Sequence, residues 1–425
     1  MWFRTLFYLH QLNRNLRLST SQLQEMQLKQ LKAMVRHANE HVPFYHKKFR
    51  AAGIKPADIK SIADLSKLPI TTKEEIQSAD IKDIVAVDTD LSSVIQRITS
   101  GSTGFPLKVF VDRTTADFED AVWARTFFEN GVKVYEKMAV IADPRSFPKR
   151  KFFQYFGLMR RKYISIFEDV RRQFELLQEY KPQVIKGYPS SLCMLADFYN
   201  DKREAFKPRL IFTSAELLDL TSRKIINSAF QVDLLDNYAC NEFGLLAWEC
   251  HEHNGYHMNI DRAVIEFVNE GTPVDFGERG EIVCTSLFNK AMPLIRYNTG
   301  DVGVTLKEQC SCGRTLPLLK IVEGRKDDFL RATDGRLFPP TIFFPYPFES
   351  LKGIRQFRVV QSKIDKIDIL LSVDQTFTDS AQVFEKAREN IQKLFGNDMQ
   401  VEFKILDNIP PDRSGKLRKV ISNIN

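Results

Sequence analysis

The chain has 425 residues, with 61 lysine and arginine residues against 54 aspartate and glutamate residues and a formal net charge of +7. This length predicts two or three domains, and 43% hydrophobic with 27% charged residues is the ordinary composition of a globular protein. Because the basic residues form no long run, the charge argues against a nucleic-acid partner and favours anionic small molecules as ligands.

The first 18 residues mix apolar and basic side chains. Arg4 and His10 interrupt the apolar character, no cleavage site of small residues follows, and no apolar run in the chain has the length that a membrane-spanning helix needs. We therefore expect no signal peptide, no transmembrane segment, and a first helix that packs on the body of the protein. A helix that lies on a membrane surface is the alternative. Residues 19–50 predict a long helix that begins at a cluster of hydroxyl residues.

The cysteines are too few for a disulfide framework at this length. They are Cys193, Cys240, Cys250, Cys284, Cys310 and Cys312. We therefore expect the protein in a reducing, cytoplasmic environment.

Short β-branched segments alternate with helical patterns between about residues 85 and 325, and several of these segments end in Gly, Ser or Asn. This alternation predicts α/β architecture, with ligands bound where strands end in small polar loops. After about residue 326 the pattern changes to strand, strand, helix and strand. The charged segment 323–336, at the boundary between the two patterns, is typical of a linker. We expect a large, multi-layer α/β domain over residues 1–325 and a small, mobile α+β domain over residues 326–425.

Six short segments place polar residues and glycines in loops or directly after predicted strands. They read TSGSTGFPLKV from residue 99, TSAELLD from residue 213, DNYACNEFG from residue 236, IRYNTGDVG from residue 295, EGRKDD from residue 323 and PPDRSGKLRKV from residue 410. Taken singly, each has a structural interpretation, such as a Ser/Gly turn, a core tyrosine or a solvated lysine. The ordered set is more specific than any of its members.

This ordered set resembles the adenylate-forming superfamily, and within it the phenylacetate-CoA ligase-like branch with its capsular-polysaccharide-associated and coenzyme-adenylylating members. TSGSTGFPLKV is similar to the family's phosphate loop, NYACNE to its Tyr-x-x-x-Glu segment, RYNTGD to its Tyr-x-Thr-Gly-Asp segment, GRKDD to its hinge motif and RSGKLRKV to its catalytic-lysine motif. The resemblance implies an AMP-forming acid–thiol ligase. A carboxylate attacks the α-phosphorus of ATP to give an acyl-adenylate and pyrophosphate, and CoA then displaces AMP to form a thioester.

The resemblance also implies which residues bind the nucleotide. They are Ser100, Gly101, Ser102, Thr103, Gly104, Ser214, Ala215, Glu216, Asn237, Tyr238, Asp301, Arg325 and Lys416. Backbone N–H groups and hydroxyls of the first five suit a cradle for the β- and γ-phosphates. The Tyr238 ring offers a face for adenine, and the Asp301 carboxylate can accept hydrogen bonds from the ribose.

The implied catalytic residues are Lys416, Glu242 and Arg325. Glu242 is a hard oxygen ligand for Mg²⁺, Lys416 brings positive charge to the α-phosphate in the first step, and Arg325 lies beside the ribose or phosphate. Because Lys416 belongs to the small domain, that domain must close for adenylation and then rotate to admit the thiol, with Asp327 as the hinge.

Two departures from the family pattern bear on the substrate. Phe105 stands where many relatives have Lys in the phosphate loop, although Lys108 is nearby. Ala239 and Asn241 stand where relatives often have Gly and Thr or Ser. The tyrosine and glutamate of that segment are retained, so we expect ATP to be used and the acyl pocket to differ from the usual aryl pocket.

A second group of residues has the chemistry of a metal site. The segments CHEHNGYH and CSC supply Cys250, His251, His253, His257, Cys310 and Cys312. Four soft ligands from two loops suit tetrahedral zinc, although the Cys-x-Cys spacing is tighter than usual and unpaired thiols with surface histidines are the alternative. Some phenylacetate-CoA ligase-like proteins have paired cysteines and a histidine in these segments. We expect structural Zn²⁺ on Cys250, His257, Cys310 and Cys312, with His253 as the alternative to His257.

Two further functions stay open at this stage. One is transfer of the adenylate or acyl group to an amine, a hydroxyl or a carrier protein in polysaccharide or secondary metabolism. The other is a non-catalytic nucleotide-binding scaffold, against which the retention of Lys416, Glu242 and Asp301 argues. The expected partners are a small carboxylic acid and CoA or another acceptor, and a homodimer is left open.

Overall fold

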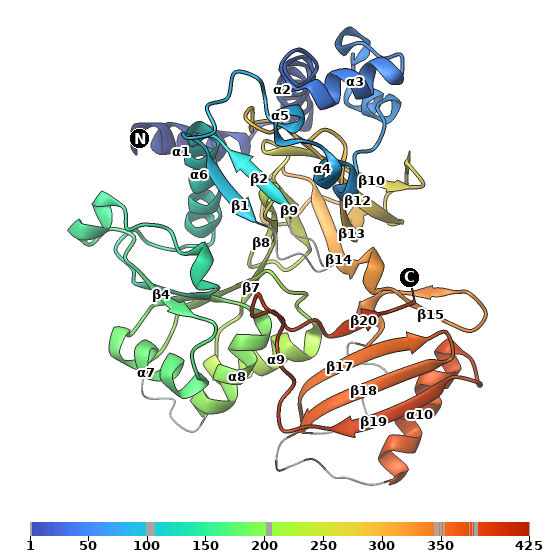
Figure 1. Cartoon of the computed structure of the whole chain (residues 1–425). Helices are drawn as coiled ribbons and strands as arrows, with labels where there is room; N and C mark the ends of the chain where they lie inside the picture. Colours follow the sequence, from blue (N-terminus) through green and yellow to red (C-terminus); the bar gives the residue numbers. More distant parts are fainter. Residues whose placement is uncertain are drawn as a thin grey trace. The chain divides into compact units, whose positions relative to one another are not determined.

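The computed structural model describes residues 2–98, 107–200, 206–343, 348, 351, 353–373, 375, 377 and 381–424. The chain forms two compact units, each assembled from two separate stretches of sequence (Figure 1). The first unit consists of Met1–Gly131 and Asn237–Val322, and the second of Val132–Asp236 and Glu323–Asn425. The domain boundary expected between residues 325 and 326 stays a prediction.

Helices dominate the first 131 residues. They are α1 (Trp2–Asn15), α2 (Thr20–His41), α3 (Pro43–Ala51), α4 (Lys73–Ser78), α5 (Ile81–Ile84) and α6 (Arg113–Glu129), with 3₁₀ turns at Pro56–Asp58 and Ile62–Lys67. Helix α2 begins at a capping box, in which the Gln22 backbone N–H donates to the Ser19 hydroxyl at 3.3 Å and the Ser19 N–H donates to the Gln22 side chain at 2.9 Å. Helix α1 packs against α6 (Figure 1). Leu12 in this helix and Leu16 directly after it are buried.

Strands β7 to β14 form a largely antiparallel sheet in the first unit, in the order β11-β10-β12-β13-β14-β9-β8-β7. They are β7 (Leu235–Cys240), β8 (Gly244–Glu249), β9 (Tyr256–Met258), β10 (Ala263–Asn269), β11 (Thr272–Pro273), β12 (Arg279–Ser286), β13 (Tyr297–Leu306) and β14 (Leu318–Arg325). Leu246, Ile282 and Leu294 lie in one buried core with Val109 and Phe110. Arg125 of α6 is buried as well, and it donates to the Asp261 carboxylate at 2.6 Å, so a charged pair also ties the helix to the sheet segment.

A separate hairpin flanks the predicted phosphate loop. Strands β1 (Ile95–Ile98) and β2 (Lys108–Val111) pair antiparallel, with Ile98 opposite Lys108. The loop connects these two strands, and residues 99–106 lie outside the described part of the chain.

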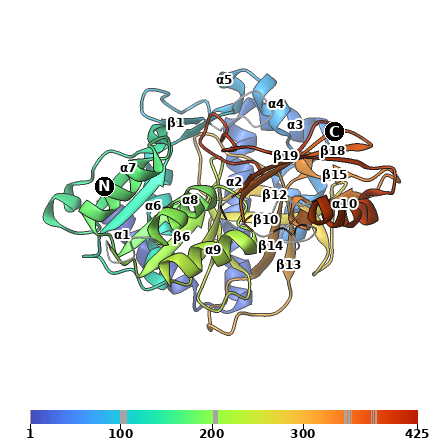
Figure 2. The same cartoon turned by 90° about the horizontal axis from the view of Figure 1, so that it is seen from below.

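The second unit begins with a parallel sheet in the order β6-β5-β3-β4. Its elements are β3 (Met138–Ala142), β4 (Arg161–Ser165), β5 (Val184–Gly187), β6 (Leu210–Ser214), α7 (Val170–Tyr180), α8 (Pro189–Asn200) and α9 (Leu220–Phe230), with 3₁₀ turns at Pro144–Ser146 and Phe152–Phe156. Ile141, Ile185 and Ile211 are buried on these strands, as parallel strands covered by helices require. Helices α8 and α9 pack side by side (Figure 2).

The carboxyl-terminal part of the second unit has its own sheet, in the order β19-β18-β17-β20. Its elements are a 3₁₀ turn at Lys326–Asp328, β15 (Leu330–Arg331), β16 (Leu337–Phe338), a 3₁₀ turn at Pro340–Phe343, β17 (Ile354–Lys363), β18 (Lys366–Val373), α10 (Ala381–Phe395), β19 (Gln400–Ile405) and β20 (Val420–Ser422). Ile391 and Phe395 of α10 share a buried core with Val359, Ile369 and Leu371 of the sheet. The alternating strands and the amphipathic helix therefore bury their apolar faces against one another.

These elements confirm the predicted fold class, α/β with a large sheet and a small α+β carboxyl-terminal part. Among the described residues, the helices are either too short or too polar to pass through a lipid bilayer.

Candidate active site

Tyr238 and Asp301 lie together in the first unit. Tyr238 is on β7 and Asp301 on β13, and the tyrosine hydroxyl donates to the Asp301 carboxylate at 2.8 Å. Burial and the neighbouring Asp301 charge raise the pKa of Tyr238 well above its ordinary value, so the phenol stays protonated and remains the donor. The hydrogen bond fixes the direction of the carboxylate.

The turn after β7 carries the other residues of this segment. The Tyr297 hydroxyl donates to the Glu242 carboxylate at 3.3 Å, and the Asn241 amide donates to the Ile98 carbonyl at 3.2 Å. Asn237, which precedes Tyr238, is buried. Asn241 thereby brings the Tyr-x-x-x-Glu segment to the end of β1, where the predicted phosphate loop begins. The loop residues Ser100, Gly101, Ser102, Thr103 and Gly104 fall outside the described residues.

In the second unit, the polar residues that follow β6 lie at the end of the parallel sheet. Ser214 is the last residue of the strand and is buried, and Ala215 adopts a left-handed conformation with φ of 77°. A non-glycine residue in this region is uncommon, and its strain is usually associated with function. The Glu216 carboxylate accepts hydrogen bonds from the Ser190 backbone N–H at 2.9 Å and from the Ser190 hydroxyl at 2.8 Å.

Lys416 lies in a tight turn that the Asp412 carboxylate organises. Asp412 accepts hydrogen bonds from the Ser414 N–H at 2.8 Å, the Ser414 hydroxyl at 2.6 Å and the Lys416 N–H at 3.0 Å. Gly415 has φ of 78°, and a Cβ atom there would lie 2.5 Å from the Ile166 side chain. Both the backbone angle and the close approach therefore require glycine.

The residues after Lys416 fasten this turn to the β6–α9 region. The Leu417 backbone N–H donates to the Glu216 carboxylate at 2.7 Å. The Lys419 ammonium pairs with Asp219 and donates to the Ser222 hydroxyl at 2.8 Å. Asp219 is also the N-cap of α9, accepting from the Ser222 N–H at 2.9 Å. We refer to Glu216 and Asp219 with their bonds to Leu417 and Lys419 as the docking contacts.

The electrostatics of these contacts follow from burial. Burial alone opposes ionisation of Asp219, but the Lys419 charge and the Ser222 donors outweigh it and lower the pKa of this carboxyl. Burial also opposes the charge on Lys419, and Asp219 reverses that effect and raises the pKa of the ammonium. Burial raises the pKa of the Glu216 carboxyl, with the Ser190 and Leu417 donors acting in the opposite direction. Asp219 and Lys419 therefore stabilise each other's charged form.

The predicted hinge adjoins these contacts. Arg325 ends β14 and precedes the 3₁₀ turn that contains Asp327 and Asp328. Asp328, next to the expected hinge residue, forms an ion pair with Arg418. Two adjacent cations, Arg418 and Lys419, therefore bind different carboxylates, one in the hinge segment and one at the start of α9.

Cys250, His257, Cys310 and Cys312 converge in the first unit. Their ligand atoms all lie within 4.8 Å of one another. The Cys250 Sγ atom is 3.6 Å from the Cys310 Sγ atom and 3.4 Å from the His257 Nε2 atom, which is 3.3 Å from the Cys312 Sγ atom. His253 instead points toward Glu249, with its Nδ1 atom 3.5 Å from a carboxylate oxygen.

The local fold explains this convergence. Cys250 follows β8, His257 lies on β9, and the two strands pair antiparallel across the turn between them. Gly255 in that turn has φ of 115°, and a Cβ atom would lie 2.7 Å from the Leu319 carbonyl oxygen. The turn can therefore close only with glycine at this position.

Burial disfavours the charged forms of the Cys250 thiol and the His257 ring. It raises the pKa of the Cys250 thiol to about 12 and lowers the pKa of His257 to about 4. A neutral imidazole is the form that binds a metal, and a divalent cation supplies the charge that a buried thiolate lacks. Three sulfurs and one imidazole nitrogen at these separations fit a structural zinc ion.

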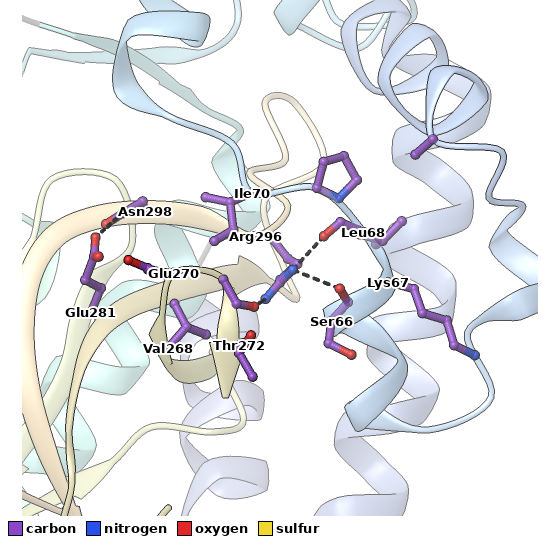
Figure 3. A pocket seen from close by; sticks show the side chains of 13 residues that line it. Ser66, Lys67, Leu68, Ile70, Val268, Glu270, Thr272, Glu281, Arg296 and Asn298 are labelled. Atoms are coloured by element: carbon purple, nitrogen blue, oxygen red, sulfur yellow. Dashed lines mark hydrogen bonds between the residues drawn. The ribbon is translucent and has the colours of Figure 1, made fainter. Parts of the chain in front are cut away.

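A pocket of about 550 Å³ opens elsewhere in the first unit (Figure 3). Arg296 lies in its wall with φ of 45° and donates to the Leu68 carbonyl at 2.6 Å and the Ser66 carbonyl at 3.3 Å. It also pairs with Glu266 at 3.0 Å. The guanidinium therefore fastens loops of the fold, and Asn298 in the same wall bonds to Glu281 at 2.8 Å.

Sequence reasoning missed Asp219, Lys419 and Asp412. Asp219 is the last residue of the motif TSAELLD and precedes Ser222 by three residues. This spacing is an N-cap pattern that the sequence alone contains. Its pairing with Lys419 joins residues 200 positions apart. That pairing has no local signal.

Comparisons with known proteins extend these observations. A family model described as CapK C-terminal domain matches residues 340–423. The phenylacetate-coenzyme A ligase of Escherichia coli (strain K12) is 27% identical over 412 residues, which cover 92% of this chain and 93% of that protein. The chain is therefore similar in sequence to a phenylacetate-coenzyme A ligase over nearly its whole length. Protein CapK of Staphylococcus aureus is 24% identical over 416 residues, covering 94% of this chain and 89% of that protein.

The solved structure of 2-hydroxyisobutyryl-CoA ligase, in the postadenylation state in complex with R3-HIB-AMP, is similar in fold. It matches with a TM-score of 0.80 at 20% sequence identity, over 97% of this chain and 92% of that chain. The likeness shows that this chain shares the fold of that CoA ligase.

Proposed function

We propose that the chain is an AMP-forming acid–thiol ligase, which converts a carboxylic acid to an acyl-adenylate with ATP and then to a CoA thioester. The observation that carries this proposal is the similarity to phenylacetate-CoA ligases, which extends over 92% and 95% of the chain in the proteins of Escherichia coli and Thermus thermophilus. The motifs that a carboxylate-activating enzyme needs occur within that similarity in the expected order.

The nucleotide is assigned to the residues that the motifs name. Tyr238 faces the adenine, Asp301 accepts from the ribose hydroxyls, and the segment Ser100–Gly104 binds the β- and γ-phosphates. The hydrogen bond from Tyr238 to Asp301 supports this assignment, because it holds an aromatic face and a ribose acceptor in a fixed relation. Ser214, Ala215 and Asn237 border the base, and Arg325 contacts the ribose or phosphate.

Lys416 is assigned to the first step. A carboxylate is a weak nucleophile and the α-phosphate is negatively charged, so a positioned ammonium lowers the repulsion between them. The Asp412-capped turn supports this role, because it holds the Lys416 backbone while the docking contacts fix the turn. The family's expected closure and rotation require these contacts to form and break in each catalytic cycle.

Two metals belong to the proposal. Glu242 would hold Mg²⁺, which would neutralise phosphate charge, and the hydrogen bond from Tyr297 orients that carboxylate. Zn²⁺ on Cys250, His257, Cys310 and Cys312 is structural, because four protein ligands leave no open position for substrate. Two cysteines of the cluster lie in the buried core that also contains Leu12 and Leu16. The metal would therefore stabilise the packing of α1 against this core.

The test is carboxylate-dependent exchange of pyrophosphate into ATP, screened over aryl, short-chain and amino acids, followed by thioester formation with CoA. At least one acid should support both reactions, and Lys416→Ala should abolish exchange while K393A, at an exposed position on α10, should not. Exchange that persists unchanged in Lys416→Ala would refute the assignment of that lysine.

A second function is favoured by one specific observation. The CapK C-terminal domain model matches residues 340–423, and CapK itself aligns with 94% of the chain. Together with the resemblance to capsular-polysaccharide-associated members of the branch, this similarity supports an alternative to CoA, which is transfer of the adenylate or acyl group to an amine, a hydroxyl or a carrier protein. Exchange without thioester formation in the same screen would favour it over the ligase, and no exchange with any acid would favour a nucleotide-binding scaffold.

A cytoplasmic location is part of the proposal, and the six free cysteines support it because such thiols persist in reducing compartments. A homodimer stays a prediction.

A further inference from the structure

One segment of the second unit has an unusual charge. Arg145, Lys149, Arg150, Lys151, Arg160, Arg161 and Lys162 give it seven cations, and no aspartate or glutamate occurs from residue 144 through residue 167. Elsewhere the chain's acidic and basic residues are nearly balanced. We refer to residues 145–162 as the basic–aromatic segment.

The same segment exposes large apolar side chains. The exposed fractions are 73% for Phe152, 67% for Tyr155, 68% for Phe156 and 42% for Leu158. Four such residues within seven positions form a concentrated patch, whereas isolated exposed apolar residues are common on any surface. The patch continues into the preceding loop, where Val134 and Tyr135 are 46% and 59% exposed.

Local hydrogen bonds fix the backbone that carries these exposed side chains. Phe152–Phe156 forms a 3₁₀ turn, in which the Lys151 N–H donates to the Gln154 side chain at 2.8 Å and the Gln154 amide donates to the Met159 carbonyl at 3.1 Å. The Arg160 guanidinium donates to the Tyr135 carbonyl at 3.2 Å, which joins the two exposed loops. The aromatic rings are therefore presented outward by a defined backbone.

Within the described part of the chain, acidic side chains face two of the segment's cations. Asp143 pairs with Arg145, and Glu179 of α7 pairs with Lys162 at 3.3 Å. The Arg150 guanidinium lies over the Tyr155 ring, 5.3 Å from its centroid, so cationic and aromatic groups share one surface. With seven cations and no carboxylate of its own, the segment carries a positive charge.

This combination selects the chemistry of the partner. A partner must be anionic to match the cations and must accept phenylalanine and aliphatic side chains. A second copy of this surface would bring the same cations against one another, which is repulsive. Single-stranded nucleic acid binds cations and aromatic rings by stacking, but Leu158 and Val134 offer no face for stacking. A bilayer with anionic lipids satisfies all these requirements, because the headgroups bind Lys and Arg while the interfacial layer accepts the rings.

We propose that the basic–aromatic segment docks the protein on the surface of a bilayer that contains anionic lipids. The rings of Phe152, Tyr155 and Phe156 enter the interface, and Lys149 and Arg150 contact the headgroups. This peripheral contact requires no membrane-spanning helix, and it does not depend on the proposed function.

The experiment is sedimentation of the full chain with vesicles of phosphatidylcholine, alone or with about a third phosphatidylglycerol. The wild-type protein should bind only the phosphatidylglycerol vesicles, and binding should weaken as ionic strength rises from about 0.05 to 0.5 M. K149Q/R150Q should lower the partition constant by roughly 25-fold, at about fivefold for each cation removed. F152S/F156S should lower it by roughly tenfold or more.

K386Q/K393Q is the matched control, because it removes two exposed cations from α10 and so changes the net charge as much as K149Q/R150Q does. Its partition constant should stay within about twofold of the wild-type value. All four substituted positions of the two test variants are exposed, so circular dichroism and the unfolding midpoint should match those of the wild type.

Three results would overturn the proposal. The first is equal binding to vesicles with and without phosphatidylglycerol, and the second is an equal loss in the α10 control and in K149Q/R150Q. The third is absence of vesicle binding together with binding of a single-stranded oligonucleotide that the segment variants lose, which would assign the surface to nucleic acid.

Discussion

Replacing Lys419 by methionine should slow adenylation without slowing thioester formation. Lys419 is not assigned to the nucleotide or to either substrate. Its ammonium instead forms the charged half of the docking contacts, with 14% of its side chain exposed and 0% of the Asp219 side chain exposed. Methionine keeps the length and most of the volume of the side chain and removes the charge.

The expected magnitude follows from the burial of the pair. Removing one partner of a buried ion pair costs roughly 3 kcal/mol at the lower end of the usual range, and the lower end applies because Asp219 keeps its Ser222 donors and its place at the start of α9. A loss of about 3 kcal/mol from the docked state corresponds to a population change of roughly 100-fold. The Leu417 N–H bond to Glu216 remains, so this factor is the upper limit for the fall in the adenylation rate.

The assay separates the two half-reactions. Carboxylate-dependent pyrophosphate exchange measures adenylation, and the reaction of a preformed acyl-adenylate with CoA measures thioester formation. K393M is the matched control, since Lys393 is exposed on α10 and carries the same side chain. Hydrogen exchange of the peptide that contains Leu417 should rise in K419M and stay unchanged in K393M.

The reasoning fails if both half-reactions fall by the same factor, because a merely destabilised enzyme would behave in that way. It also fails if exchange in K419M equals that of the wild type. Amide hydrogen exchange needs no substrate, so it reports on docking even if the proposed ligase activity is not found.

Four further predictions concern single sites. By metal analysis, the purified protein should hold one zinc ion. C312A should lose this zinc, whereas C193A, which lies outside the cluster, should retain it. Less than a tenth of an equivalent of zinc in the wild-type protein would refute the site. Tyr238→Phe should raise the KM for ATP by about fivefold, through loss of one hydrogen bond to a carboxylate, with little change in thermal stability; an unchanged KM would refute the contact's role. Gly415→Ala should lower adenylation roughly tenfold or more, because of its positive φ and the contact with Ile166. Burial lowers the pKa of Lys186 from 10.5 to about 7. Between these pH values the unfolded chain binds more protons than the folded chain, so the free energy of unfolding should rise with pH. Chemical denaturation of K186M at several pH values should show that this slope is lost.

Much of the fold could be predicted from the sequence because its signals are local. The capping box at Ser19 and the strand–strand–helix–strand pattern after residue 326 depend on neighbouring residues and on the spacing of apolar side chains. The chemistry of the motifs is local too. An aspartate in RYNTGD and a lysine in RSGK offer the same groups whatever surrounds them.

The partners of those residues depend on contacts between distant segments. Sequence spacing left two histidines open for the proposed zinc site, and pairing of β8 with β9 places His257, not His253, beside the three sulfurs. The resemblance assigned Glu216 to the nucleotide, and the structure adds that its carboxylate accepts a hydrogen bond from the Leu417 N–H. Lys419 resembled any other lysine until the chain brought it to Asp219. The sequence therefore determined which chemical groups are present, and only tertiary structure decided their partners, because burial and long-range pairing arise when distant segments pack together.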